Sequence, residues 1–99
     1  MEYDIALYTK KSELLKALAH PIRLCIVRGL MTQGSCNVAH MEECLNVSQS
    51  AVSQHLSKLK AAGILRVNRT GNSNMYEVVD PEVIRLIVCL FKEEGKGTI

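Results

Sequence analysis

The sequence predicts a mainly α-helical domain that carries one small β-hairpin. Apolar residues recur at helical spacing up to residue 62, the pattern then changes to alternating β-branched residues, and a strongly apolar helical segment follows. The chain has 99 residues, 47% of them hydrophobic, which is typical of a single domain. We expect this domain to span residues 1–99, with a flexible tail at about residues 95–99.

Two helices are expected before residue 34. In YTKKSELLKALAH, Leu14, Leu15 and Leu18 recur at helical spacing, with lysines on the other side. The stretch HPIRLCIVRGLMTQG begins with Pro21, which suits the first position of a helix, and ends at Gly34. Apolar residues form two rows along this second helix, so we expect neighbours to cover it on more than one side.

Two further helices follow, joined by a short turn. The first is expected at about residues 37–45 with Asn37 as its N-cap, and the segment NVS then turns the chain. The second is capped by Ser48 and runs to Ala62, where Gly63 ends it. One row of this helix is apolar, whereas the opposite row carries only hydroxyl and amide groups. The apolar row is Val52, Leu56 and Leu59, and the polar row is Ser50, Ser53, Gln54 and Ser57.

The next segment has the pattern of a β-hairpin. The stretches ILRVNRT and MYEVVD contain alternating and β-branched residues, and the GNSN between them predicts a Gly/Asn turn. Two arginines, Arg66 and Arg69, lie on the first of these strands.

The last helix is expected in DPEVIRLIVCLFKEE. Asp80 is its N-cap and Pro81 takes the first helical position. Eight of the nine residues from Val83 to Phe91 are apolar. A helix that is apolar all round must be covered all round, so in a chain this short we expect a second copy to cover one side.

This order of elements (four helices, a hairpin and a last helix) is that of a winged helix-turn-helix. In such proteins the second helix of the motif enters the major groove of DNA and meets base edges with its N-terminal side chains. Amide groups pair with adenine, hydroxyls serve either kind of edge, and lysines hold phosphates. The sequence therefore predicts contacts with double-stranded DNA, although a solvated polar face is the alternative. The expected contacts are Ser48 at the helix N-terminus, then Gln49, Ser50, Ser53, Gln54, Lys58 and Lys60.

Three stretches of the sequence together resemble one protein family. LLKALAHPIRLCIVRGL, CLNVSQSAVSQHLSKLKAAGIL and RVNRTGNSNMYEVVD are similar to the ArsR/SmtB family of homodimeric bacterial winged-helix repressors, over about Glu13 to Phe91. The resemblance implies a dimer formed by the first and last helices, an inverted-repeat operator, and release when a small inducer binds. The residues expected at the dimer interface are Leu14, Leu18, Val83, Ile84, Ile87, Leu90 and Phe91.

The same resemblance adds three residues to the DNA interface. It places His55 near the DNA backbone and the hairpin arginines, such as Arg69, near the flanking minor groove or phosphates. The alternative for His55 is a packed position beside Leu56. One of Arg66 and Arg69 is expected only to stabilise the hairpin.

Cys36, His40 and Cys44 recur every four residues and raise the question of a metal site. Residues eight apart lie about 12 Å apart along a helix, whereas two ligands of one zinc ion lie within roughly 4 Å of each other. A continuous helix therefore cannot place all three on one ion, but Cys36 could join if the helix starts after it. In the family that the chain resembles, the thiolate ligands occupy the positions of Asn37 and Ala39 here. We expect no metal and no cofactor, and a Cys44 packed beneath the recognition helix.

Two more cysteines lie on the second and last helices. Cys25 and Cys89 are expected to be core thiols within apolar rows, and a redox pair that senses oxidants or reactive sulfur is the alternative. Sensing of arsenite by thiols also remains open. The candidates for effector binding are Cys25, Cys36, Cys44 and Cys89.

The sequence thus predicts a homodimeric transcriptional repressor and not an enzyme. The chain has no early apolar run of the signal-peptide type and no stretch near the roughly 20 apolar residues of a membrane span. Its four cysteines are expected to be reduced thiols, so we expect a cytoplasmic protein. The alternatives are a repressor without a metal or redox effector, a winged helix that contacts proteins, and a thiol enzyme or metal carrier using Cys36 or Cys44. A thiol enzyme or metal carrier would require a Cys-x-x-Cys pair or a fixed base beside a cysteine, and the sequence has neither.

Overall fold

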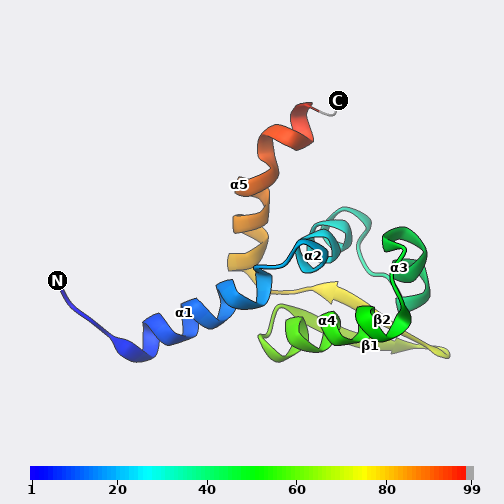
Figure 1. The fold of residues 1–99 in the computed structure, drawn as a ribbon, viewed down its shortest axis with the longest axis horizontal. Coiled ribbons are helices and arrows are strands. Elements are labelled where there is room, and N and C mark those ends of the chain that lie inside the picture. The colour runs from blue at the N-terminus through cyan, green and yellow to red at the C-terminus, as the bar shows by residue number, and fades with distance from the viewer. Residues whose placement is uncertain (98–99) are drawn as a thin grey trace.

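The computed structural model describes residues 1–97, and the side chains of residues 1–92. It confirms the predicted order of elements (Figure 1). These elements are α1 (Ile5–Leu18), α2 (Pro21–Gln33), α3 (Val38–Leu45), α4 (Gln49–Ala61), β1 (Leu65–Thr70), β2 (Ser73–Val78) and α5 (Pro81–Gly97).

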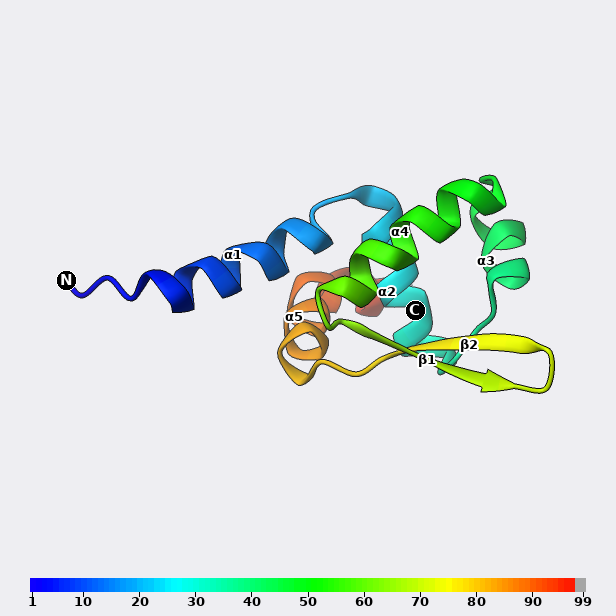
Figure 2. The same cartoon turned by 90° about the horizontal axis from the view of Figure 1, so that it is seen from below.

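Helices α2, α3 and α4 and the hairpin form the body of the molecule, from which α1 and α5 project in different directions (Figures 1 and 2). A single apolar core holds the body together. Val27 of α2, Val52 and Leu59 of α4, and Ile64 before the hairpin are fully buried in it. The same core extends to the ends of α1 and α5 that meet the body, through Leu18 and Val83.

This core corrects part of the predicted dimer interface. Leu18, Val83 and Ile87 are only 4%, 0% and 1% exposed within the single chain, so they have no surface left to offer a partner. Their side chains are covered because α1 and α5 join the body at these positions. By contrast, Leu90 on the outer part of α5 is 55% exposed.

Polar side chains fix the starts of the helices, as the sequence predicts. Asn37 accepts a hydrogen bond from the His40 amide at 2.9 Å, and Ser48 accepts one from the Ala51 amide at 3.1 Å. The turn between α3 and α4 is made by Asn46, which ends α3 in the left-handed region at φ 56°. Asparagine tolerates this conformation better than most residues, so it allows the tight reversal between the two helices.

The hairpin turn is shorter than predicted. Ser73 pairs with Thr70, so only Gly71 and Asn72 connect the antiparallel strands, and the SN of GNSN belongs to β2. A two-residue turn needs positive φ angles, which Gly71 provides with φ 62°. The strands can therefore continue closer to the turn than the four-residue prediction allowed.

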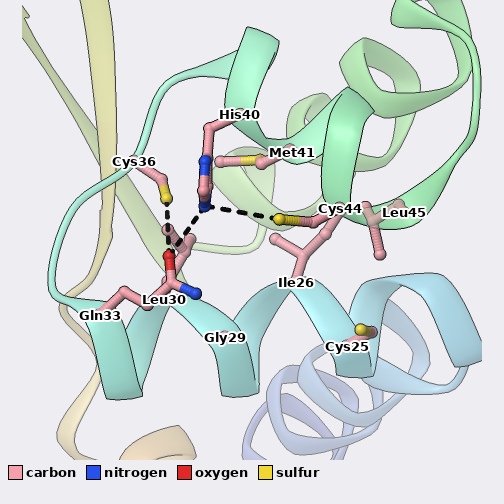
Figure 3. Close-up of a pocket in the computed structure, with 10 residues that line it drawn as sticks. All are labelled: Cys25, Ile26, Gly29, Leu30, Gln33, Cys36, His40, Met41, Cys44 and Leu45. Atoms are coloured by element: carbon pink, nitrogen blue, oxygen red, sulfur yellow. Dashed lines mark hydrogen bonds between the residues drawn. The ribbon is translucent and has the colours of Figure 1, made fainter.

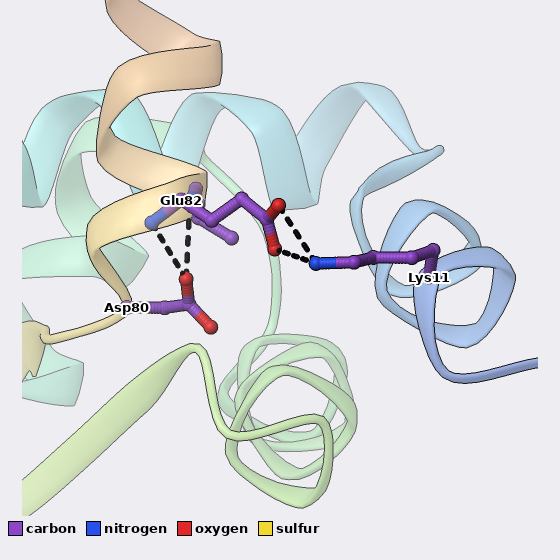
Figure 4. A network of polar contacts seen from close by, with 4 residues as sticks. Lys11, Asp80 and Glu82 are labelled. Carbon is purple, nitrogen blue, oxygen red and sulfur yellow. Dashed lines mark hydrogen bonds and ion pairs between the residues drawn. The ribbon is translucent and has the colours of Figure 1, made fainter. Parts of the chain in front are cut away.

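A polar contact joins α1 to the start of α5 (Figure 4). Asp80 caps α5 by accepting hydrogen bonds from the amides of Glu82 and Val83, at 2.9 and 3.1 Å. The Glu82 carboxylate in turn pairs with the Lys11 ammonium at 2.7 Å. Both side chains are about half exposed, so the pair contributes little to the stability of the fold.

The last helix extends into the segment expected to be a flexible tail, and the flexibility of that segment stays a prediction. Helix α5 continues to Gly97, beyond the expected boundary at about residue 95. A glycine costs a helix only about 1 kcal/mol relative to alanine, so Gly95 does not end it. Residues 98–99 lie outside the described part of the chain. Within that part, no helix has both the length and the apolar character needed to cross a membrane.

Candidate nucleic-acid interface

The polar row of α4 lies on the surface. Gln49, Ser50, Ser53 and Gln54 are all exposed, and so are the cap Ser48 and the later Lys58 and Lys60. On the opposite side, Val52 and Leu59 are fully buried and Leu56 is 2% exposed. The buried row anchors the helix to the core and leaves every hydroxyl and amide of the polar row available to a partner.

The hairpin extends toward the same end of the molecule as the start of α4. In Figures 1 and 2, the tip of the hairpin and the N-terminal end of α4 both lie away from α1. A recognition helix contacts base edges with its N-terminal residues, so the tip of the wing lies at the same end of the molecule as the part of α4 that would enter a groove.

The two hairpin arginines have different surroundings. Arg66 pairs with the Glu77 carboxylate across the hairpin, with Nε 3.1 Å from Oε1, and Asn68 donates to the same oxygen at 3.0 Å. Arg69, next to the turn, donates to the Gly71 carbonyl at 3.3 Å. Among the described side chains, Arg69 contacts no carboxylate. Arg66 therefore serves the hairpin, whereas the charge of Arg69 is available to a phosphate.

His55 is half buried and packs against His20 at the start of α2. The two ring centroids lie 4.4 Å apart, and the planes are inclined by 46°. Burial lowers the pKa of His55, and the nearby His20 and Arg23 lower that pKa further. His20 itself caps α2, since its Nδ1 accepts a hydrogen bond from the Ile22 amide at 3.1 Å. The structure thus favours a packing role for His55, and a contact with the DNA backbone stays a prediction.

The lowered pKa of His55 predicts that stability falls on mild acidification. The folded chain holds a proton on His55 less readily than the unfolded chain, whose histidine has a pKa near 6.5. The stabilisation is therefore complete above about pH 6.5 and is lost as the pH falls from there through the pKa of the folded state. Urea unfolding between pH 7.5 and 5 should show this loss, and His55→Gln should reduce it. An identical pH dependence in the variant would contradict the assignment.

The cysteines correct two predictions. Cys44, which was expected beneath the recognition helix, is exposed, because Met41 is the residue that α3 buries. Cys25 and Cys89, which were expected as core thiols, are also exposed in the single chain. The core rows of α2 and α5 run through neighbouring residues, so these two thiols lie beside the buried rows and not within them.

Cys36 is the buried thiol. It precedes α3, and its backbone pairs with Tyr76 of β2 through hydrogen bonds of 3.2 and 2.9 Å. Burial raises the pKa of Cys36, with a smaller contribution from Cys44 in the same direction. Its Sγ donates to the side-chain oxygen of Gln33 at 3.3 Å. Sequence reasoning did not single out Gln33, because its role depends on how the end of α2 meets the loop before α3.

Comparison with known proteins identifies the family. Residues 20–67 match the family of bacterial regulatory proteins of the arsR type. The transcriptional repressor PagR of Bacillus anthracis is 40% identical over 79 residues, which cover 80% of this chain and 79% of PagR. The chain belongs to the ArsR family. The transcriptional repressor SmtB of Mycobacterium tuberculosis is 37% identical over 87 residues, or 88% of this chain, and the match spans 64% of the length of SmtB.

Solved structures of two similar proteins have the same fold. The crystal structure of PagR superposes with a TM-score of 0.80 at 37% identity, covering 88% of this chain and 99% of that one. HlyU from Vibrio cholerae superposes with a TM-score of 0.83 at 30% identity, covering 90% and 96% of the two chains.

Proposed function

We propose that this ArsR-family chain is a sequence-specific DNA-binding transcriptional repressor. The observation that carries the proposal is the exposed row of hydroxyl and amide groups on α4, which contains no acidic residue. Such groups donate to and accept from base edges, while a carboxylate would repel the phosphates beside them. PagR and SmtB, to which the chain is similar, are transcriptional repressors, which supports the same proposal.

We also propose that the chain represses transcription as a homodimer, which forms through α1 and α5. Both helices project from the body and keep large apolar side chains on their surfaces. The exposed residues include Tyr8 and Leu15 on α1 and Val88 and Leu90 on α5, which are between 53% and 57% exposed. A second copy that covers them would present two recognition helices related by a two-fold axis, and such a pair reads an inverted repeat.

The proposal is tested first by the salt dependence of DNA binding. We expect the chain to shift a duplex in gel-shift assays and the logarithm of its affinity to fall linearly with the logarithm of the salt concentration, because phosphate contacts release counterions. Absence of binding to any duplex at low salt would contradict the proposal.

The wing arginines provide a matched pair of variants for the same assay. Arg69→Ala should weaken binding to all duplexes and lower the salt slope by about one unit, since it removes one phosphate contact. Arg66→Ala should leave the salt slope nearly unchanged, because the charge of Arg66 is already paired with Glu77. It should lower the free energy of unfolding by less than about 1 kcal/mol, because that pair is exposed. The reverse ranking would contradict the assignment of the two arginines.

A further inference from the structure

Hollows on the surface of the molecule differ in the chemistry of their walls. The hollow between α2 and α3 is lined mainly by apolar and sulfur-bearing side chains (Figure 3). Another hollow, with a volume of about 790 Å³, lies between α1, the start of α2 and α4. Its eight lining residues include three cations, Lys16, Arg23 and Lys58, and one acid, Glu13. This second hollow is therefore the one that would attract an anion.

Arg23 brings an unsatisfied donor to the hollow between α1, α2 and α4. Its side chain is half-buried, and its buried Nε atom finds no acceptor among the described residues. No described carboxylate pairs with it either. Burial, then His20 and then Arg23 lower the pKa of His55, so the surroundings of this guanidinium are electropositive. A guanidinium presents its donors as a fork that fits two oxygens of one phosphate, and a buried donor without an acceptor costs free energy.

The same hollow continues the polar row of α4. Ser57 belongs to that row and lines the hollow, and Lys58 follows it on the helix. Figures 1 and 2 both show the end of α1 beside the C-terminal half of α4. A helix that meets base edges with its N-terminal residues has its later turns near the DNA backbone. A duplex held by α4 therefore brings phosphates toward this hollow.

Small side chains leave room for a phosphate. Ala17, Ala61 and Ala62 form part of the wall, and the volume is many times the roughly 30 Å³ that one water molecule occupies. A phosphate can therefore enter together with the sugars beside it. The one carboxylate, that of Glu13, lies 3.8 Å from the Lys16 ammonium on the same helix, and both side chains are largely exposed. Glu13 can therefore turn into solvent when an anion arrives.

We propose that Arg23 and Lys58, assisted by Lys16, hold one phosphate of the DNA backbone in this hollow. The three cations come from α2, α4 and α1, so a single phosphate fixes the position of three helices on the duplex. The contact reads no base, and its effect is to set the position of α4 in the groove. The inference rests on the proposed DNA binding and adds α2 and α1 to the recognition helix and the wing.

Gel-shift titrations test the role of the cations. Arg23→Gln should weaken binding to every duplex at least about tenfold and lower the salt slope by about one unit, because it removes one charged contact. Ala61→Glu, which places a carboxylate in the hollow, should also weaken binding to every duplex, whereas the uncharged Ala61→Gln should not. Arg85→Gln removes an equal charge from α5, which projects away from α4, and should leave affinity and slope unchanged. Urea midpoints show whether each variant is folded.

Uncharged methylphosphonate groups, placed one at a time in a preferred duplex, identify the phosphate itself. We expect one position in each half-site at which this change weakens the wild type at least about tenfold and leaves Arg23→Gln unaffected. A residue that only supports the fold would show no coupling to a single phosphate. Inorganic phosphate that replaces chloride at constant ionic strength is the last arm, and we expect it to leave duplex binding by the wild type unchanged.

The outcomes separate this inference from the proposed function. A wild type that binds no duplex would overturn both. A wild type that binds DNA, with an Arg23→Gln variant of equal affinity and slope or with no methylphosphonate position coupled to Arg23, would overturn this inference alone. Displacement of the duplex by inorganic phosphate from the wild type but not from Arg23→Gln would assign the hollow to a free phosphate ion and contradict the DNA backbone as its source.

Discussion

Leu59→Ala should lower the free energy of unfolding by about 2–5 kcal/mol, the range found for leucine-to-alanine changes in protein cores. Leu59 is 0% exposed and lies in the row that fixes α4 to the body. A domain of this size is stabilised by only about 5–15 kcal/mol in total, so the variant should lose a large part of its stability and its DNA binding with it. Urea unfolding at a fixed protein concentration measures the change.

The matched control for Leu59 is on the same helix. Ser57 is exposed on the polar side of α4, and Ser57→Ala should change the free energy of unfolding by less than about 0.5 kcal/mol. A similar loss in both variants would show that α4 is held by something other than the packing of its apolar row.

Gln54→Ala should cost about 1–3 kcal/mol of binding to a preferred duplex and should relax the preference at one base position. The reason is that the amide of Gln54 is exposed in the second turn of α4, where it can pair with a base edge. Lys58→Ala, one turn further along, should instead weaken binding to all duplexes alike and lower the salt slope by about one unit. Gel-shift titrations against a set of duplexes with single base changes separate the two effects.

The comparison of these two variants tests whether the polar row of α4 reads base sequence. If Gln54→Ala weakened all duplexes equally, the amide would be a backbone contact and base reading would have to come from elsewhere. If Lys58→Ala changed the base preference, the lysine would not be the phosphate contact that its position late in the helix implies.

The course of the backbone could be predicted from the sequence because its signals are local. Asn37, Ser48 and Asp80 act as N-caps, and Pro21 and Pro81 occupy first helical positions, as their residue types predict. The apolar row of α4 was equally predictable, since a helical period assigns its buried side without reference to the rest of the chain.

The surroundings of individual side chains were less predictable because they depend on contacts distant in sequence. Arg66 differs from Arg69 because it faces the Glu77 carboxylate on the opposite strand. The exposure of Cys25 and Cys44 depends on how α2 and α3 are rotated about their axes. The apolar pattern fixes this rotation only to within about one residue position. For the dimer interface, the sequence identifies which helices are apolar. It does not show which side of each helix packs against the core of the same chain and which side remains for a partner.

The central claim, that α4 reads base sequence as part of a two-fold dimer, is tested most directly by selection from a pool of random duplexes. The wild type should enrich an inverted repeat whose half-sites lie about one helical turn apart. A variant in which Gln49, Ser53 and Gln54 are all alanine should bind duplexes without enriching any sequence. Failure of the wild type to enrich an inverted repeat, or enrichment of the same repeat by the triple variant, would contradict the claim.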